Sequence, residues 1–366
     1  MKTTKIISAC AVLAALASCS NDHELFHQSP TPSDSDVINI VAASSKPVTR
    51  AAGTEDLQDT QFDTGEKINV YLEENGGNTT TYEMLRYEVT NINNDGGKQL
   101  ELVSTPAQDA PHYPISGNGI NACAFYPALG TTNAAYDVTT SSTSFSVAED
   151  QSLIADYRKS DLMFGTNNWD TENSGALITG FEGTKKPNPV KLYFKHLLSK
   201  IIVKLKPGSG LTATQLQGAT VKLYNAYPTA NITPSKTGIT VNVDKNSTLP
   251  NGGYTLTTDY ASSESPSDLD NYAGCAGIII PQDIATAAPT KFIEIKLSQD
   301  NGSGKYVYNI ADSDTNTDDS KMTFASGKQY TYTITLSAGN VVVVSTQIQN
   351  WVNKDINGEA NLVDAQ

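Results

Sequence analysis

A strict alternation marks residues 67–72, which read Lys-Ile-Asn-Val-Tyr-Leu. Ile68, Val70 and Leu72 fall on one face of an extended chain, because successive side chains of a strand point to opposite sides. The residues between them carry polar groups. This period of two predicts a strand of an antiparallel sheet with one buried face and one solvated face.

The same alternation returns along the rest of the chain. It recurs at Ile201/Val203/Leu205, Ile239/Val241/Val243, Ile293/Ile295/Leu297 and Tyr330/Tyr332/Ile334/Leu336. Clusters of Gly and Asn, which favour turns, separate these runs, and no long stretch keeps the spacing of a helix. Many short strands with frequent turns predict an all-β fold of antiparallel β-sandwiches.

The length of 366 residues exceeds that of a usual single domain and predicts two. We expect the break within residues 183–189, Gly-Thr-Lys-Lys-Pro-Asn-Pro, because the stretch is polar and its prolines exclude it from a central strand. The expected β-sandwich domains are then residues 51–187 and 188–366, after a tether and first strand at 19–50.

The N-terminus has the order of a secretory signal: Lys2 and Lys5, an apolar run at residues 6–16, then small residues. The run is too short for a transmembrane helix, which needs about 20 apolar residues. It ends in Leu-Ala-Ser-Cys at 16–19, which resembles a bacterial lipobox. We expect residues 1–18 to be a lipoprotein signal peptide and the Cys19 thiol to be acylated. The alternative is a plain secretory peptide with an incidental cysteine.

A short strand is predicted at residues 36–43, Asp-Val-Ile-Asn-Ile-Val-Ala-Ala, between two polar stretches. The polar stretch after it contains Arg50, followed by Ala51. An arginine in an exposed linker is readily cut by an Arg-specific protease. Arg50 is therefore a candidate maturation site, and the alternative is an ordinary linker residue.

Charge and cysteine content exclude several classes of protein. The formal net charge is −14, and only 17% of residues are charged, so the electrostatic attraction on which nucleic-acid binding depends is missing. Cys123 and Cys275 lie among apolar neighbours and far apart in sequence, which favours buried free thiols over a disulfide.

Catalytic and metal-binding patterns are weak, and we expect neither enzymatic activity nor a cofactor. Residues 302–305, Gly-Ser-Gly-Lys, lack the rest of a phosphate loop and are interpreted as a hairpin turn. Residues 312–318 resemble half of a calcium loop, but Thr317 replaces the turn glycine, so an acidic surface turn is the interpretation. His196 is expected to be a hydrogen-bonded core residue and Trp351 a core or interface anchor.

A series of short motifs resembles the fimbrillin superfamily, the two-domain pilins and related surface proteins of Bacteroidales. In order along the chain, these motifs lie at residues 62–71, 124–128, 150–151, 157–165, 194–201, 279–282, 327–332 and 348–351. Each is short, and their order and spacing together carry the resemblance, which extends from the lipobox almost to the end. It implies two transthyretin-like β-sandwich domains and a structural role in a pilus that supports adhesion.

The resemblance also implies a route of assembly. The subunit would reach the outer membrane through the lipid on Cys19, and an Arg-specific protease would cut between Arg50 and Ala51. The displaced strand would carry Val37, Ile38, Ile40 and Val41. Other copies of the chain, or related pilins, would be the partners, each supplying a strand from residues 340–366 to fill the vacated place. The donor residues would be Val342, Val344, Ile348 and Trp351.

Three alternatives stay open. The stretch from Val341 to Ile348 is equally suited to be the last strand of its own domain. Within the same family, a tip or anchor subunit with an adhesive role is the second interpretation. A surface glycan-binding lipoprotein is the third, although Trp169 and Trp351 are too far apart in sequence to indicate an aromatic platform.

Overall fold

The computed structural model describes residues 37–42, 62, 64–74, 81–92, 98–102, 110–114, 117–129, 142–168, 189–258, 273–285, 290–298, 304–310, 321–338 and 340–351. Strands dominate this part of the chain, and its two helices are short, α1 (Ile154–Lys159) and α2 (Ala213–Leu216). No helix among these residues is long and apolar enough to cross a membrane. The predicted all-β fold is confirmed.

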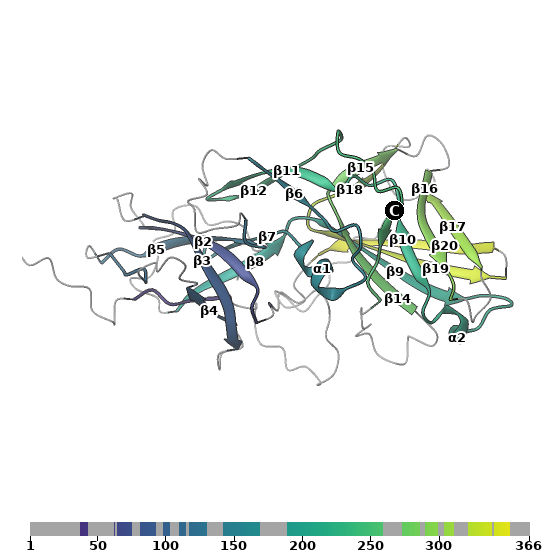
Figure 1. Ribbon diagram of the computed structural model, residues 1–366, viewed down its shortest axis with the longest axis horizontal. Helices are drawn as coiled ribbons and strands as arrows, with labels where there is room; N and C mark the ends of the chain where they lie inside the picture. The colour runs from purple at the N-terminus through teal and green to yellow at the C-terminus, as the bar shows by residue number, and fades with distance from the viewer. Residues whose placement is uncertain are drawn as a thin grey trace, which may run out of the picture. The chain divides into compact units, whose positions relative to one another are not determined.

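Seven strands form a closed barrel, most of whose members are labelled in Figure 1. In order around the barrel they are β1 (Ile40–Ala42), β4 (Lys98–Leu102), β3 (Thr81–Ile92), β2 (Lys67–Glu74), β5 (Ile120–Tyr126), β7 (Met163–Thr166) and β8 (Val190–His196). Neighbouring strands are antiparallel except β1 and β8, which run parallel. Because β1 pairs with both β4 and β8, this strand closes the barrel.

Four further sheets follow. One has the order β13 (Tyr254–Thr255), β10 (Thr220–Leu223), β16 (Thr290–Lys296), β17 (Lys305–Ile310), and a three-stranded one has β12 (Gly238–Val243), β11 (Thr229–Ser235), β6 (Thr143–Ser146). A four-stranded sheet, coloured from teal through green to yellow in Figure 1, has the order β14 (Ala273–Ile279), β9 (Ser199–Pro207), β19 (Lys328–Ser337), β20 (Asn340–Asn350). A two-stranded sheet pairs β15 (Gln282–Ala285) with β18 (Lys321–Phe324).

The buried side chains fall into two apolar clusters, which we call the barrel core and the main core. The barrel core includes Ile68, Val70 and Leu72, the residues whose alternation predicts a strand, and all three are fully buried. The second face of β2 is not solvated as expected. Tyr71 packs into the main core, and Asn69 accepts a hydrogen bond from the Leu129 backbone N–H. Both faces of this strand are therefore covered.

The expected boundary between residues 187 and 188 falls inside the barrel. It separates β7 from β8, yet these strands pair with each other from Met163↔His196 to Thr166↔Tyr193. The proline-containing stretch therefore connects two neighbouring strands of one sheet. The three-stranded sheet also spans the expected boundary, because β6 lies before residue 187 and pairs with β11, which lies after it. Two sheets therefore contain strands from both sides of residue 187, and the division into two domains stays a prediction.

Candidate functional site

The strand that closes the barrel is also one of its shortest members. β1 pairs antiparallel with β4, Val41 opposite Gln99, and parallel with β8, Ile40 opposite Val190. The Ile38 N–H donates to the Pro111 carbonyl at 2.8 Å, and the Asn39 carbonyl accepts from the Val190 N–H at 2.8 Å. We call the space that residues 38–42 fill between β4 and β8 the β1 slot.

Burial of apolar side chains holds this segment in the slot. Ile38, Ile40, Val41 and Ala42 are 3%, 1%, 5% and 4% exposed. Ile38, Ile40 and Ala42 alternate along the chain and all belong to the barrel core. Burial of the three larger side chains, Ile38, Ile40 and Val41, contributes about 5 to 9 kcal/mol to stability, at about 1.5 to 3 kcal/mol each. This is comparable with the net stability of a whole domain, about 5 to 15 kcal/mol.

Phe62 belongs to the same barrel core, although Arg50 lies between it and β1 in the sequence. Its ring contacts Tyr126 edge-on at 5.0 Å and Phe194 edge-on at 4.9 Å between centroids. The ring is 2% exposed. Chain segments before and after Arg50 are thus both anchored in one core, and a cut at Arg50 leaves each with its own apolar anchor.

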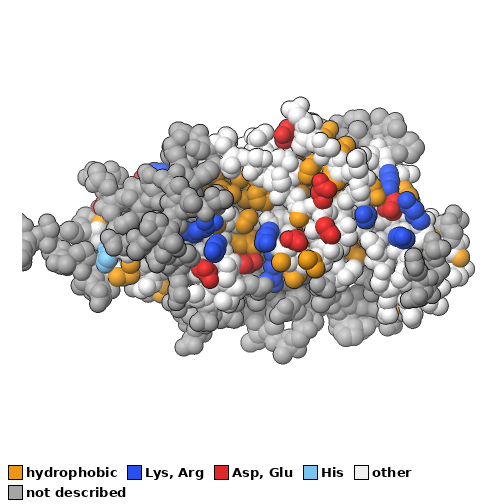
Figure 2. Space-filling view, viewed as in Figure 1, with side chains coloured by type: hydrophobic (Ala, Val, Ile, Leu, Met, Phe, Trp, Pro, Cys, Tyr) orange, Lys and Arg blue, Asp and Glu red, His pale blue; other side chains and the backbone are white. Residues whose placement is uncertain are grey.

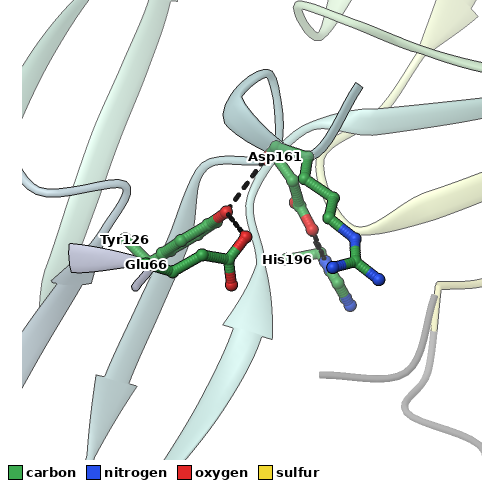
Figure 3. A network of polar contacts seen from close by, with 5 residues as sticks. Glu66, Tyr126, Asp161 and His196 are labelled. Atoms are coloured by element: carbon green, nitrogen blue, oxygen red, sulfur yellow. Dashed lines mark hydrogen bonds and ion pairs between the residues drawn. The ribbon is translucent and has the colours of Figure 1, made fainter. Parts of the chain in front are cut away.

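Polar contacts join the ends of several barrel strands (Figure 3). The Tyr126 hydroxyl donates to Glu66 at 2.7 Å, and burial together with this carboxylate raises the pKa of Tyr126. His196, the last residue of β8, lies with Nδ1 2.9 Å from an Asp161 carboxylate oxygen. His196 is 5% exposed, so the expectation of a hydrogen-bonded core histidine is confirmed.

The last strand occupies the edge of its own sheet. β20 pairs antiparallel with β19 from Ser337↔Asn340 to Lys328↔Asn350. Val344 lies opposite Ile334 and Ile348 opposite Tyr330, whereas Val342 falls at a register shift, the position of a bulge. The possibility that this stretch is the last strand of its own sheet is therefore realised in the isolated chain.

Trp351 follows β20 directly and fastens its end. Its backbone N–H donates to the Gly327 carbonyl at 2.7 Å, and its indole stacks on the His196 ring at 4.0 Å between centroids with 6° between the planes. Trp351 is 6% exposed and belongs to the main core, which confirms the prediction of a core anchor.

Two buried polar atoms at this end of the chain have no hydrogen-bond partner among the described residues. They are Trp351 Nε1 and Thr346 Oγ1. A buried group without a partner costs about 1 to 3 kcal/mol. The last strand is therefore docked on β19 with part of its hydrogen-bonding capacity unused.

The other predicted site residues divide into two groups. Val37, which is half-buried, precedes the slot residues. Cys19, Arg50 and Ala51 lie outside the described residues, as do the acidic turn at 312–318 and the tail at 352–366. Their roles stay predictions.

The sequence alone does not identify the residues that line the slot. Val190 and Leu192, both fully buried on β8, face the barrel core beside β1. Their signal is the alternation Val190, Leu192, Phe194, which predicts a strand but does not identify its partner. The expected boundary between residues 187 and 188 comes directly before this strand in the sequence.

Reactive groups do not converge in the part of the chain that the structure describes. No group of three or more His, Cys, Asp or Glu side chains there could hold a metal ion.

Cys123 and Cys275 are free and buried, as predicted, and burial raises the pKa of each thiol to about 12. On the face in Figure 2, Lys and Arg side chains lie among Asp and Glu rather than in a field of one sign.

The amino-acid sequence was compared with models of known protein families. The model of the fimbrillin-like family matches residues 49–351, most of the chain. The chain belongs to the fimbrillin-like family. No curated protein matches this fimbrillin-like chain.

Solved structures resemble the fimbrillin-like chain over most of its length. A putative cell adhesion protein from Bacteroides uniformis is 20% identical with a TM-score of 0.57, covering 88% of this chain and 100% of its own. A putative cell adhesion protein from Bacteroides ovatus is 18% identical with a TM-score of 0.56, covering 88% and 99%. At this identity the likeness shows a shared fold, which agrees with the all-β architecture of the fimbrillin-like chain.

Proposed function

We propose that the chain is a structural pilus-type subunit that supports adhesion at the cell surface. It is exported as a lipoprotein on Cys19, matured by a cut between Arg50 and Ala51, and joined to further copies by strand exchange. The observation that carries this proposal is the position of β1, which closes the barrel and lies eight residues before Arg50. The family membership and the fold shared with a putative cell adhesion protein support the same role.

The cut changes how β1 is held. Before it, residues 38–42 are tied to the barrel by the chain itself. Afterwards only main-chain bonds and the burial of about three large side chains hold them, so they are free to be exchanged for another strand. An empty slot exposes Val190 and Leu192 together with the unpaired edges of β4 and β8. A cut subunit is thus driven to take up a replacement strand, and dissociation of that strand is as slow as unfolding.

The donor is expected within residues 340–366 of the next subunit. Val342, Val344, Ile348 and Trp351 supply the apolar side chains, and the tail after Trp351 extends the segment. Before processing, the lipid on Cys19 holds the precursor at the outer membrane. The cut then releases residues 19–50, lipid and first strand together.

A second candidate is a tip or anchor subunit of the same kind of pilus. It is favoured by the pairing of β20 with β19 over the whole length of β20, since a subunit that ends a filament has no need to donate its last strand. Such a subunit accepts a strand and does not supply one. When added to a growing polymer of cut subunits, a subunit of this kind would terminate the polymer rather than extend it.

The test is to treat purified precursor with an Arg-specific protease and look for SDS-resistant ladders. We expect ladders with the wild type and none with Arg50→Ala. Replacing residues 47–52 by the recognition sequence of an unrelated protease should restore ladders with that protease alone. Deleting residues 340–366 should abolish them. Cut subunits that stay monomeric would contradict the proposal, and ladders from the deleted protein would exclude the proposed donor.

A further inference from the structure

The C-terminal strand is held asymmetrically. Among the described strands, β20 has one neighbour, β19, whereas β19 also pairs with β9 on its other side. An edge strand has half the ladder of an inner strand, and the register shift at Thr335/Leu336 interrupts the ladder near its beginning. What fixes the far end of β20 therefore matters for whether the strand stays docked.

That far end is fixed by one aromatic contact to the barrel. Trp351 stacks on His196, and His196 is the last residue of β8, the strand that borders β1. Asp161 contacts the imidazole at 2.9 Å and sets the plane on which the indole lies. The Trp351 main chain is held as well, through the Gly327 carbonyl. We call the stacked pair of Trp351 and His196 the C-terminal latch.

The latch closes at a cost in hydrogen bonding. Trp351 Nε1 is buried without an acceptor among the described residues, and Thr346 Oγ1 on the same strand is buried without a partner. Each of these groups would regain a hydrogen bond in water or in another pairing, and this favours the open state. Stacking and burial favour the closed one. The docked strand is thus held by stacking and burial against an opposing cost in hydrogen bonds.

We propose that the C-terminal latch keeps β20 on its own subunit and sets how readily this strand becomes available to a second copy of the chain. Opening it frees β20 from its far end, because the remaining pairing with β19 begins at Asn350. The availability of β20 to another copy rests on the proposed function, whereas the latch itself is a property of the single subunit.

The test is hydrogen exchange on the full, uncut subunit, in which assembly does not take part. In Trp351→Ala and in His196→Ala we expect the β20 amides to exchange at least tenfold faster, with no change in β2 and β5. Trp351→Phe keeps a ring on His196 and removes the unpaired indole N–H, so its β20 exchange should be no faster than in the wild type. Unchanged exchange in Trp351→Ala overturns the latch, as does an equal rise in the barrel strands.

A second measurement separates the latch from the proposed function. After the cut at Arg50, Trp351→Ala should form ladders faster than the wild type, and Trp351→Phe should not. If hydrogen exchange shows that β20 opens in Trp351→Ala, yet this variant and the wild type form ladders at equal rates, the role of the latch in assembly is overturned. Absence of ladders in the wild type contradicts the proposed function instead, and the exchange result then still decides whether the latch exists.

Discussion

His196 and Trp351 stack face to face, with their ring planes 6° apart. The contact joins residues far apart in sequence, the end of β8 and the residue after β20. β8 contacts β1 near its beginning and Trp351 at its end. One strand of the barrel therefore touches both segments for which strand exchange is proposed.

Ile40→Ala should destabilise the uncut protein by about 2 to 5 kcal/mol, the usual range for truncation of a buried Ile. Ile40 is 1% exposed in the barrel core, so the smaller side chain leaves a cavity. Urea unfolding followed by tryptophan fluorescence measures the change. Lys191→Ala, at an exposed position of neighbouring β8, is the control and should alter stability by less than about 0.5 kcal/mol. Equal effects would show that β1 is not packed as described.

Gly165→Ala should destabilise the barrel because the added methyl has no space. A Cβ at this position would lie 2.6 Å from the Phe194 ring, closer than atoms can approach. The expected cost is about 1 to 3 kcal/mol, as for other overpacked cores. Phe194→Leu should relieve part of it, so the double variant should lose less stability than the sum of the two single ones. Simple additivity in thermal unfolding would contradict the contact.

Gln151→Ala should weaken the main core through lost hydrogen bonds. The side chain is fully buried, donates to the Ile278 carbonyl at 2.8 Å and accepts from the Ile278 N–H at 2.8 Å. Removing it leaves this N–H buried without its partner, at about 1 to 3 kcal/mol. Denaturant unfolding measures the loss. Ser152→Ala, at the exposed neighbouring position, should change little, and a similar loss in both variants would refute the assignment.

Cys123 and Cys275 should resist iodoacetamide until the protein unfolds. Burial raises the pKa of both to about 12, so hardly any thiolate is present at pH 8, and neither sulfur is accessible. Mass spectrometry of the labelled peptides distinguishes them from the other two cysteines. Labelling of either thiol in the folded state at the rate of a free cysteine would contradict this burial.

The same thiols make stability depend on alkaline pH. The pKa of each thiol is higher in the folded than in the unfolded state, so the folded protein retains the proton. The contribution of the two buried thiols to the free energy of unfolding is therefore complete below about pH 9. It is lost as the pH rises from 9 toward 12. Replacing both residues by Ala should flatten this part of the curve of unfolding free energy against pH, although it lowers stability at neutral pH.

Local pattern predicts the strands of this protein well and their partners poorly. The alternation at Ile68/Val70/Leu72 and Tyr330/Tyr332/Ile334/Leu336 predicts buried faces, which β2 and β19 have. The apolar stretch before Arg50 predicts a strand, realised at Ile40–Ala42. These signals depend on side chains that follow one another in the chain.

The pairings depend on distant residues, and the sequence alone does not specify them. β1 lies beside β8 in parallel, across about 150 residues of chain. The prolines at 187 and 189, which favour a break between domains, directly precede β8, and the pairing of β8 with β7 cannot be read from them. Gln151 belongs to one of the family-like motifs, but its bonds to Ile278 cannot be read from sequence, since a polar residue in a loop carries no sign of a buried partner.

The β1 slot and β20 lie at different places on the same chain, and this gives any assembly built from them a direction. A contact between unlike surfaces does not close on itself as a twofold dimer does, and repetition leads to an open fibre or a ring. In an open fibre the two ends differ chemically: one subunit keeps an unfilled slot, and at the other end a last strand stays unused. Growth and termination would then take place at opposite ends, each controlled by a different part of the molecule.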